Sequence, residues 1–369
     1  MSVTSTVFDW RNLVANNKPS QASDIQIARL EALPQLTIDL DKWANQYNLP
    51  NQRVEVFAYT GCVTTLVPFS YQKALLFAKY CLWIVSFDAY IDNFDYSQFN
   101  PTRSNTWLDY LDSQLSYIVK PLYKLGGLTT EHGHNYCFKF SFDQLNEFQG
   151  IENTSLNLEA ALQSLYCDLR ASWLSAPQQE PNNIQRLNFS LTNFTHYLAQ
   201  MIEAMRWELI QNFNYQKILD CHQLPNMEEY LNRSSFSIGL HPAGAIVAGY
   251  EIDPETTWQL CNTAIDIGAE IVRLANDLGN YWLELEECKV NSITIALAQL
   301  GFAPMGAYQK NSLEVKQAAE IVKAKLEVEL ERFAKQVIEI PNTPLLHWLQ
   351  VQLAFVLAMY EKGNYVKPD

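Results

Sequence analysis

The chain has 369 residues, of which 48% are hydrophobic and 18% charged, a composition typical of a globular protein with a large core. Its 40 acidic and 26 basic residues give a net charge of -14, which disfavours binding to nucleic acid or to an anionic membrane surface. The seven cysteines form no Cys-x-x-Cys pair and indicate reduced core thiols. The opening residues, MSVTSTVFDW, lack the pattern of a signal peptide, so we expect a cytoplasmic protein.

Apolar residues repeat at intervals of three and four along most of the chain, which predicts helices. The predicted helical segments are Ile25 to Leu33, Tyr71 to Phe94, Leu156 to Leu174, Asn193 to Phe213, Pro254 to Glu287, Val315 to Ile338 and Pro344 to Tyr360. Strand-like alternation is scarce, and no internal repeat or long linker is found. We therefore predict an all-α fold of about a dozen helices in a single domain, residues 1–369, with residues 1–24 as a flexible or capping segment.

Several predicted helices carry aromatic residues on faces that should point inward. These residues are Tyr80, Trp83, Phe87, Trp173, Tyr197, Trp207, Trp258, Phe355 and Tyr360. Core packing alone explains such a pattern, because aromatic side chains dominate protein cores. An aromatic-lined cavity inside a helical bundle is the alternative, and it requires polar groups at one end of the cavity. The apolar runs themselves, such as Tyr80 to Phe87, are shorter than the roughly 18 residues of a membrane span.

A first group of acidic residues, Asp88, Asp92 and Asp95, follows such an aromatic segment. Their spacing of four and three places the three carboxylates on one face of a helix. Like charges in this arrangement repel one another, and a hard cation such as magnesium would relieve the repulsion. The spacing equally fits a solvated helix end, so both interpretations stay open at this point.

A second polar ladder lies in IVRLANDLGNYWLE, from Ile271 to Glu284. Asn276, Asn280 and Glu284 are spaced by four residues, and Arg273 lies one turn earlier on the same side. Two amides and one carboxylate are a reasonable set of ligands for one hard cation. An ordinary polar stripe explains this segment equally well when it is judged alone. The two ladders together favour metal binding, because both offer only oxygen ligands on otherwise apolar helices.

These motifs resemble those of the class I terpene synthases of microbial type. In that family an Asp-Asp-x-x-Asp or Asp-Asp-x-x-Glu motif follows an aromatic helix, and FDAYID, which ends at Asp92, is similar to it. The family's second motif, Asn-Asp-x-x-Ser/Thr-x-x-x-Glu, is matched from Asn276 to Glu284. A diphosphate-sensing arginine in a Tyr-Leu-x-x-Arg context has its approximate counterpart in YLNR, ending at Arg233. The serines after it and Gly239 suit the broken helix that follows in the family.

The chain departs from the family pattern at four positions. Ala89 stands at the usual second aspartate, so Asp88 carries more of the metal binding. Asn280 replaces Ser or Thr and keeps an oxygen ligand. Leu283 and Met359 stand where the family often has basic residues, which leaves fewer groups to bind diphosphate.

The resemblance implies a magnesium-dependent lyase that ionises a linear prenyl diphosphate, releases diphosphate and cyclises the carbocation inside a single α-helical bundle. The implied ligands of three magnesium ions are Asp88, Asp92, Asn276, Asn280 and Glu284. The implied catalytic residues are Asp88, Arg233, Asn276, Asn280 and Glu284. Diphosphate binding falls to Arg233, Arg273 and Tyr360. The implied substrate cavity is lined by Trp83, Phe87, Trp207, Phe236 and Phe355.

Geranylgeranyl diphosphate is the favoured substrate and farnesyl diphosphate the next, because of the chain length and the KVNS sequence that follows the second motif. Two alternatives stay open. One is a chain-elongating prenyl synthase, which should carry two aspartate-rich motifs. The other is a decayed, non-catalytic helical homologue, which Ala89, Leu283 and Met359 favour. We expect no nucleic-acid partner and no membrane span, and a homodimer is one oligomeric state open to the protein.

Overall fold

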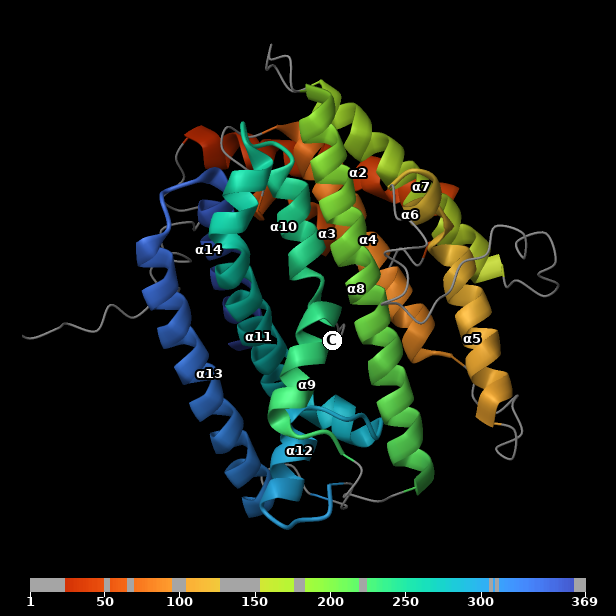
Figure 1. Cartoon of the computed structure of the whole chain (residues 1–369). Coiled ribbons are helices and arrows are strands. Elements are labelled where there is room, and N and C mark those ends of the chain that lie inside the picture. Colours follow the sequence, from red (N-terminus) through yellow and green to blue (C-terminus); the bar gives the residue numbers. More distant parts are fainter. Residues whose placement is uncertain are drawn as a thin grey trace, which may run out of the picture. The chain divides into compact units, whose positions relative to one another are not determined.

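The structure is a computed structural model of the whole chain, and it describes residues 24–49, 54–64, 70–94, 104–126, 153–175, 183–218, 224–304, 308 and 312–361. In these residues the chain forms thirteen α-helices and one short 3-10 helix, η6, and no strand (Figure 1). The predicted all-α fold is confirmed. Nearly all of the expected capping segment, residues 1–24, lies outside the described residues.

The helices occur along the chain in the following order. Those that begin before residue 200 are α2 (Asp24–Gln46), α3 (Val54–Thr64), α4 (Tyr71–Asp92), α5 (Ser104–Ile118), α6 (Lys120–Lys124), α7 (Asn153–Leu174) and α8 (Asn183–Ile218). The later ones are α9 (Met227–Ser234), η6 (Ser235–Ile238), α10 (Leu240–Ala248), α11 (Pro254–Glu286), α12 (Ser292–Gln299), α13 (Leu313–Glu339) and α14 (Pro344–Glu361). The described residues form two compact units. Unit 1 comprises 204–241 and 258–361, and unit 2 comprises 24–203 and 242–257.

The predicted segments with long apolar repeats coincide with helices. Helices α4, α7, α11, α13 and α14 begin and end within three residues of the prediction. The short helices α3, α9, α10 and α12 were not predicted, because eight to eleven residues contain too few turns for a clear period.

Helix α2 is longer than predicted. It continues through Pro34 to Gln46, although the predicted segment ended at Leu33. A proline inside a helix removes one backbone hydrogen bond and clashes with the preceding turn. Beyond the proline, Leu36, Leu40 and Trp43 are buried, at most 5% exposed, so packing of this face outweighs the local cost.

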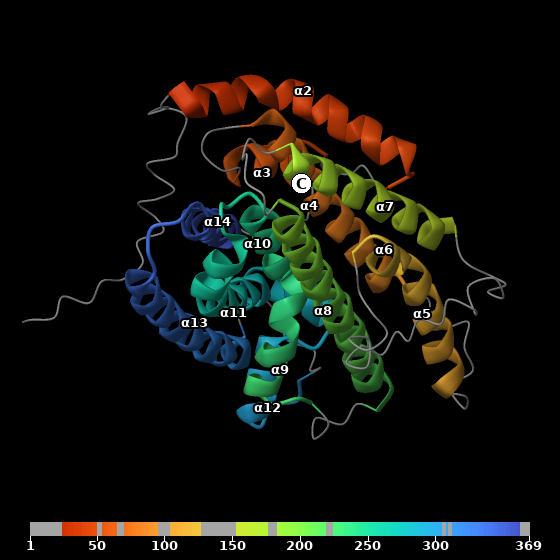
Figure 2. The same ribbon diagram turned by 45° about the horizontal axis from the view of Figure 1, so that its top comes forward.

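Helix α4 packs against α2, α3 and α7 within unit 2 (Figure 2). Its N-cap is Ser70, whose side chain accepts a hydrogen bond from the Lys73 backbone amide. Trp83 and Phe87 are fully buried, and their rings stack with centroids 5.4 Å apart. Trp83 Nε1 also donates to the Leu158 carbonyl at 2.9 Å. Trp83 and Phe87, which the sequence analysis expected to line a cavity, are thus packed in the apolar core of unit 2.

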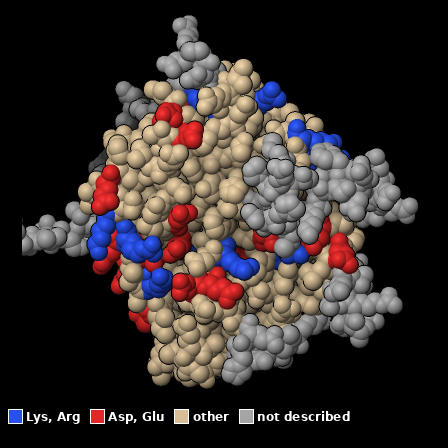
Figure 3. Space-filling model, in the orientation of Figure 1, with Lys and Arg blue, Asp and Glu red and all other residues tan. Residues whose placement is uncertain are grey.

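Helix α4 is the one described helix that is long and apolar enough to cross a membrane by length and composition. Its most apolar window has a mean hydropathy of 1.5, and 61% of that window is buried inside the protein, as in the core helix of a globular unit. Acidic and basic side chains are interspersed on the face shown in Figure 3, and no continuous basic surface is visible among its described residues.

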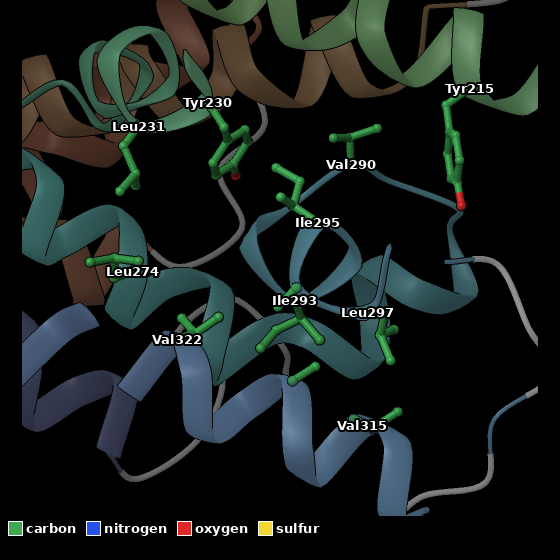
Figure 4. Close-up of a cluster of buried hydrophobic side chains, with 12 residues drawn as sticks. Tyr215, Tyr230, Leu231, Leu274, Val290, Ile293, Ile295, Leu297, Val315 and Val322 are labelled. Atoms are coloured by element: carbon green, nitrogen blue, oxygen red, sulfur yellow. The ribbon is translucent and has the colours of Figure 1, made fainter. Parts of the chain in front are cut away.

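The core of unit 1 contains a cluster of buried apolar side chains from α8, α9, α11, α12 and α13 (Figure 4). The labelled members are Tyr215, Tyr230, Leu231, Leu274, Val290, Ile293, Ile295, Leu297, Val315 and Val322. Residues 292–297 of α12 are all buried, as expected of a helix that is apolar on nearly every side. This packing holds the N-terminus of α12 against α11.

Candidate active site

The second motif lies on α11, a helix of 33 residues. Asn276, Asn280 and Glu284 are partly buried and recur every four residues, so they form one row along the helix. Arg273 and Asp277 belong to a neighbouring row and are buried, Asp277 completely. The helix therefore carries a row of oxygen atoms beside a buried ion pair.

Arg273 and Asp277 are the centre of a charged network in unit 1. Arg273 Nε lies 3.1 Å from Asp277 Oδ1, and its NH1 lies 3.3 Å from Glu208 Oε1 on α8. Arg273 Nε donates to the Tyr230 hydroxyl at 2.6 Å, and that hydroxyl donates to Asp277 Oδ2 at 3.1 Å. Burial alone would lower the pKa of Arg273, but the two carboxylates raise that pKa well above its ordinary value. The guanidinium is therefore fixed as a cation.

Asn276 is oriented by a residue of α14. Its Nδ2 donates to the Tyr360 hydroxyl at 2.6 Å. A Cβ atom at Gly279 would lie 3.0 Å from Tyr360 Cδ1, so the glycine allows the tyrosine to approach α11 this closely. Burial raises the pKa of Tyr360 to about 12, and the hydroxyl therefore stays protonated at neutral pH. Because this bond uses the amide nitrogen of Asn276, its carbonyl oxygen is the group available to a cation.

Asn280 occupies the middle of the row. Its Oδ1 is buried and has no hydrogen-bond partner among the residues that the structure describes. Leaving a buried acceptor unsatisfied costs about 1–3 kcal/mol, so such an atom in a native protein requires an explanation. A hard cation shared with Asn276 and Glu284 would satisfy it.

Glu284 closes the row, and its Oε2 accepts a hydrogen bond from Asn291 Nδ2 at 2.7 Å. Burial raises the pKa of Glu284 to about 8, the Asp277 carboxylate adds to this rise, and Arg273 opposes it. The cluster contains one guanidinium, that of Arg273, and three carboxylates, those of Glu208, Asp277 and Glu284. The fully ionised cluster therefore has an excess of negative charge, which a divalent cation would offset.

The predicted helix break after Arg233 is confirmed. Helix α9 ends at Ser234, η6 follows, and Gly239 has a φ of 75° before α10 begins. Arg233 is exposed, and its guanidinium carbon lies 5.5 Å from the centre of the Trp207 ring. No acidic residue of the described chain forms an ion pair with Arg233. An exposed contact of this kind is worth about 0.5–1 kcal/mol and leaves the N–H groups able to bind an anion.

The first motif lies at the C-terminal end of α4, in unit 2. Asp88 and Asp92 are exposed and share one face of the helix, whereas Ala89 is partly buried. The helix ends at Asp92 with Asn93 as its C-cap, and Asp95 lies outside the described residues. A helix C-terminus carries partial negative charge, so two carboxylates at this end favour a cation.

Three further predicted cavity residues lie in unit 1. Trp207 on α8 contacts Tyr230, with ring centroids 6.4 Å apart, and Phe236 in η6 stacks on His241 at 4.5 Å. Phe355 on α14 is partly buried. These contacts place the aromatic residues in the packing of unit 1, and their role in lining a cavity stays a prediction.

Sequence reasoning missed two members of the site. Glu208 directly follows Trp207 on α8, and no signal in the sequence distinguished it from the neighbouring charged residues Glu203 and Arg206. Asn291 lies seven residues after Glu284, in the KVNS sequence. A buried Asn directly before a helix is the usual sign of an N-cap, but its second partner on α11 could not be read from spacing.

Comparisons with known proteins agree with this arrangement. Residues 142–319 match the family model described as "Terpene synthase family 2, C-terminal metal binding". This stretch includes Arg233 and the row on α11, and it begins after the first motif. The resemblance to the class I terpene synthases is confirmed. No curated protein matches this chain.

The fold of this chain is similar to that of solved structures. A single-substitution variant of the SVS_A2 protein from ancestral sequence reconstruction is 13% identical with a TM-score of 0.57, and the match covers 91% of this chain and 86% of that chain. A double-substitution variant of the same protein is 12% identical with a TM-score of 0.56 and the same coverage. At these identities the likeness shows the fold alone.

Proposed function

We propose that the protein is a magnesium-dependent terpene cyclase, a carbon-oxygen lyase that ionises a linear prenyl diphosphate, releases diphosphate and closes the carbocation into rings. Geranylgeranyl diphosphate is the favoured substrate, and farnesyl diphosphate is the next. The family match over residues 142–319, whose description names metal binding, supports this proposal at its coarser level. Side chains of the described chain support the finer parts.

One observation carries the metal assignment: the buried Oδ1 of Asn280 has no partner in the described chain. A cation bound by Asn276, Asn280 and Glu284 explains this atom, and a solvated polar stripe does not, because water would reach it. The excess of carboxylates around Arg273 supports the same assignment. Magnesium suits these ligands because it prefers hard oxygen donors and retains several waters.

Each of the other two proposed ligands already has a supporting residue. Asn276 is held by Tyr360 through its amide nitrogen, and Glu284 is held by Asn291 through Oε2. This leaves the single carbonyl oxygen of Asn276 and the second carboxylate oxygen of Glu284 to face a cation. Residues that orient metal ligands in this way are common around metal sites. The first motif would supply the ligands Asp88 and Asp92 for the further ions implied by the resemblance.

Binding of the diphosphate group falls first to Arg233. Its planar guanidinium can form paired hydrogen bonds with phosphate oxygens and stays charged at every working pH. Arg273 contributes a buried positive charge next to the row, and Tyr360 contacts the row directly through Asn276. Magnesium, when bound, supplies positive charge that stabilises the departing diphosphate.

The chain's aromatic residues complete the proposed chemistry. An allylic carbocation is consumed by water unless the site excludes it, and aromatic faces stabilise a cation by about 0.5 to 2 kcal/mol each. Trp83, Phe87, Trp207, Phe236 and Phe355 are the residues proposed for this role. Substitution of each by leucine should change the mixture of cyclic products more than the rate of diphosphate release.

The test is incubation of the purified protein with magnesium and, in separate reactions, geranyl, farnesyl, geranylgeranyl and geranylfarnesyl diphosphate, with products identified by gas chromatography and mass spectrometry. A cyclic hydrocarbon from geranylgeranyl diphosphate is the expected result. Longer linear diphosphates formed in the presence of isopentenyl diphosphate would instead indicate a chain-elongating synthase. Unchanged substrate in every reaction would indicate a decayed homologue.

A further inference from the structure

Asn291 forms hydrogen bonds in two directions from a fully buried position. It is the N-cap of α12, and its Oδ1 accepts from the Thr294 backbone amide at 2.8 Å. Thr294 Oγ1 in turn accepts from the Asn291 backbone amide at 2.7 Å, which completes a capping box. The other end of the side chain, Nδ2, donates to Glu284 Oε2 at 2.7 Å. One amide therefore joins the start of α12 to the last member of the row on α11.

The neighbouring backbone is fixed in the same place. The Ser292 amide donates to Asp277 Oδ2 at 2.9 Å, and the Val290 amide donates to Asn212 Oδ1 of α8 at 2.8 Å. Helix α12 itself lies in the apolar cluster of unit 1 (Figure 4). The capping hydrogen bonds, the contacts of both flanking residues and the packing of α12 therefore fix the position of Asn291. Its Nδ2 cannot move far from its place beside Glu284.

The Glu284 carboxylate needs such a partner. It lies near the Asp277 carboxylate, and in the described chain Asn291 is its one hydrogen-bond donor from a side chain. Without that donor the carboxylate would be free to rotate away from the row, and its charge would be less compensated. The donor also binds only Oε2, so the other oxygen is left to face the cation.

We propose that Asn291 is a positioning residue that fixes Glu284 for cation binding, and that the N-terminus of α12 thereby sets the affinity of the row for magnesium. This inference rests on the proposed function. Loss of a residue that orients a metal ligand typically weakens metal affinity by about 10- to 100-fold. We expect a loss of that size when the Nδ2 donor is removed.

The decisive variant is Asn291→Ser. Serine is about as good an N-cap as asparagine, so the cap of α12 is retained while the bond to Glu284 is lost. The matched control is Thr294→Val, which breaks the capping box and leaves the Asn291 to Glu284 bond in place. Magnesium is titrated into each protein at a fixed saturating concentration of inorganic diphosphate, and the shift in Tm is recorded without any substrate turnover.

We expect the magnesium concentration at half-maximal shift to rise about 10- to 100-fold in Asn291→Ser and to stay near the wild-type value in Thr294→Val. In a Glu284→Ala background, Asn291→Ser should weaken magnesium binding no further, because the residue through which it acts is gone. Equal midpoints in wild type and Asn291→Ser would overturn the inference. If Asn291→Ser does not fold, Asn291→Asp gives the same test, since it keeps the cap acceptor and replaces the donor with a second carboxylate. A wild-type protein without any magnesium-dependent shift would instead overturn the proposed function.

Discussion

The Tyr360 hydroxyl lies 2.6 Å from Asn276 Nδ2, so a residue of the last helix determines the orientation of a proposed metal ligand on α11. Tyr360→Phe removes this acceptor and keeps the ring in place. We predict that magnesium affinity, measured by the Tm shift with inorganic diphosphate, falls by about tenfold, because the Asn276 amide can then rotate. An unchanged affinity would mean that Tyr360 does not orient Asn276.

Gly279 controls the approach of the same tyrosine. In Gly279→Ala the new methyl group would lie 3.0 Å from Tyr360 Cδ1 and 3.4 Å from its Cβ, which forces the side chain to shift. We predict weaker magnesium binding than in the wild type, although alanine favours the helix by about 0.5–1 kcal/mol. Gly268→Ala, a change in the same helix, is the matched control: its methyl group would lie 3.2 to 3.4 Å from the ends of leucine side chains, away from Tyr360, and it should leave magnesium binding unchanged.

Asp277 is fully buried and accepts from Tyr230 and from the Ser292 amide, besides its ion pair with Arg273. Removing one partner of a buried ion pair leaves the other charge uncompensated and typically costs 3–5 kcal/mol. Asp277→Asn should therefore lower the free energy of unfolding in urea by about 3 kcal/mol.

The control for this loss is Glu320→Gln, which removes one partner of the exposed pair with Lys323 on α13. Exposed pairs contribute about 0–1 kcal/mol, so a change of that size is expected. Equal effects of the two substitutions would contradict the central place of Asp277 in the network.

Cys288, the second residue after the end of α11, has a φ of 55°, a left-handed conformation. This is the position where helices most often end in glycine, and a residue with a side chain there is strained by about 1–2 kcal/mol. Cys288→Gly relieves this strain, and the greater entropy of glycine in the unfolded chain offsets part of the gain, so the free energy of unfolding should rise by a net amount of about 0.5–1 kcal/mol. Cys288→Ala also removes the thiol but keeps the strain, and it should give no such gain in a urea denaturation curve.

Sequence alone predicted the bounds of α4, α7, α11, α13 and α14 closely, whereas α2 and α8 extend well beyond their predicted segments. Helix α11 could be predicted because its apolar repeat runs for many turns, and the row from Asn276 to Glu284 follows from the spacing of four. The break between Arg233 and Gly239 was predicted as well, because glycine adopts the positive φ that ends η6.

Contacts between helices could not be predicted from the sequence. Glu208 and Asn291 meet α11 from other helices, and no spacing within one segment reveals such a pair. The extension of α2 past Pro34 has the same cause, since packing of its buried face overrides a local signal. The roles of Asp88 and Asp92 in metal binding follow from the resemblance and stay predictions.

The most direct test of the central claim compares wild type with Asn280→Ala on geranylgeranyl diphosphate, with cyclic product and released diphosphate measured in the same reaction. We predict cyclic product and an equal amount of diphosphate from the wild type, complete loss of both when EDTA removes magnesium, and kcat/KM lower by at least about 100-fold in Asn280→Ala. Turnover that persists in EDTA, or an Asn280→Ala protein as active as the wild type, would contradict the account.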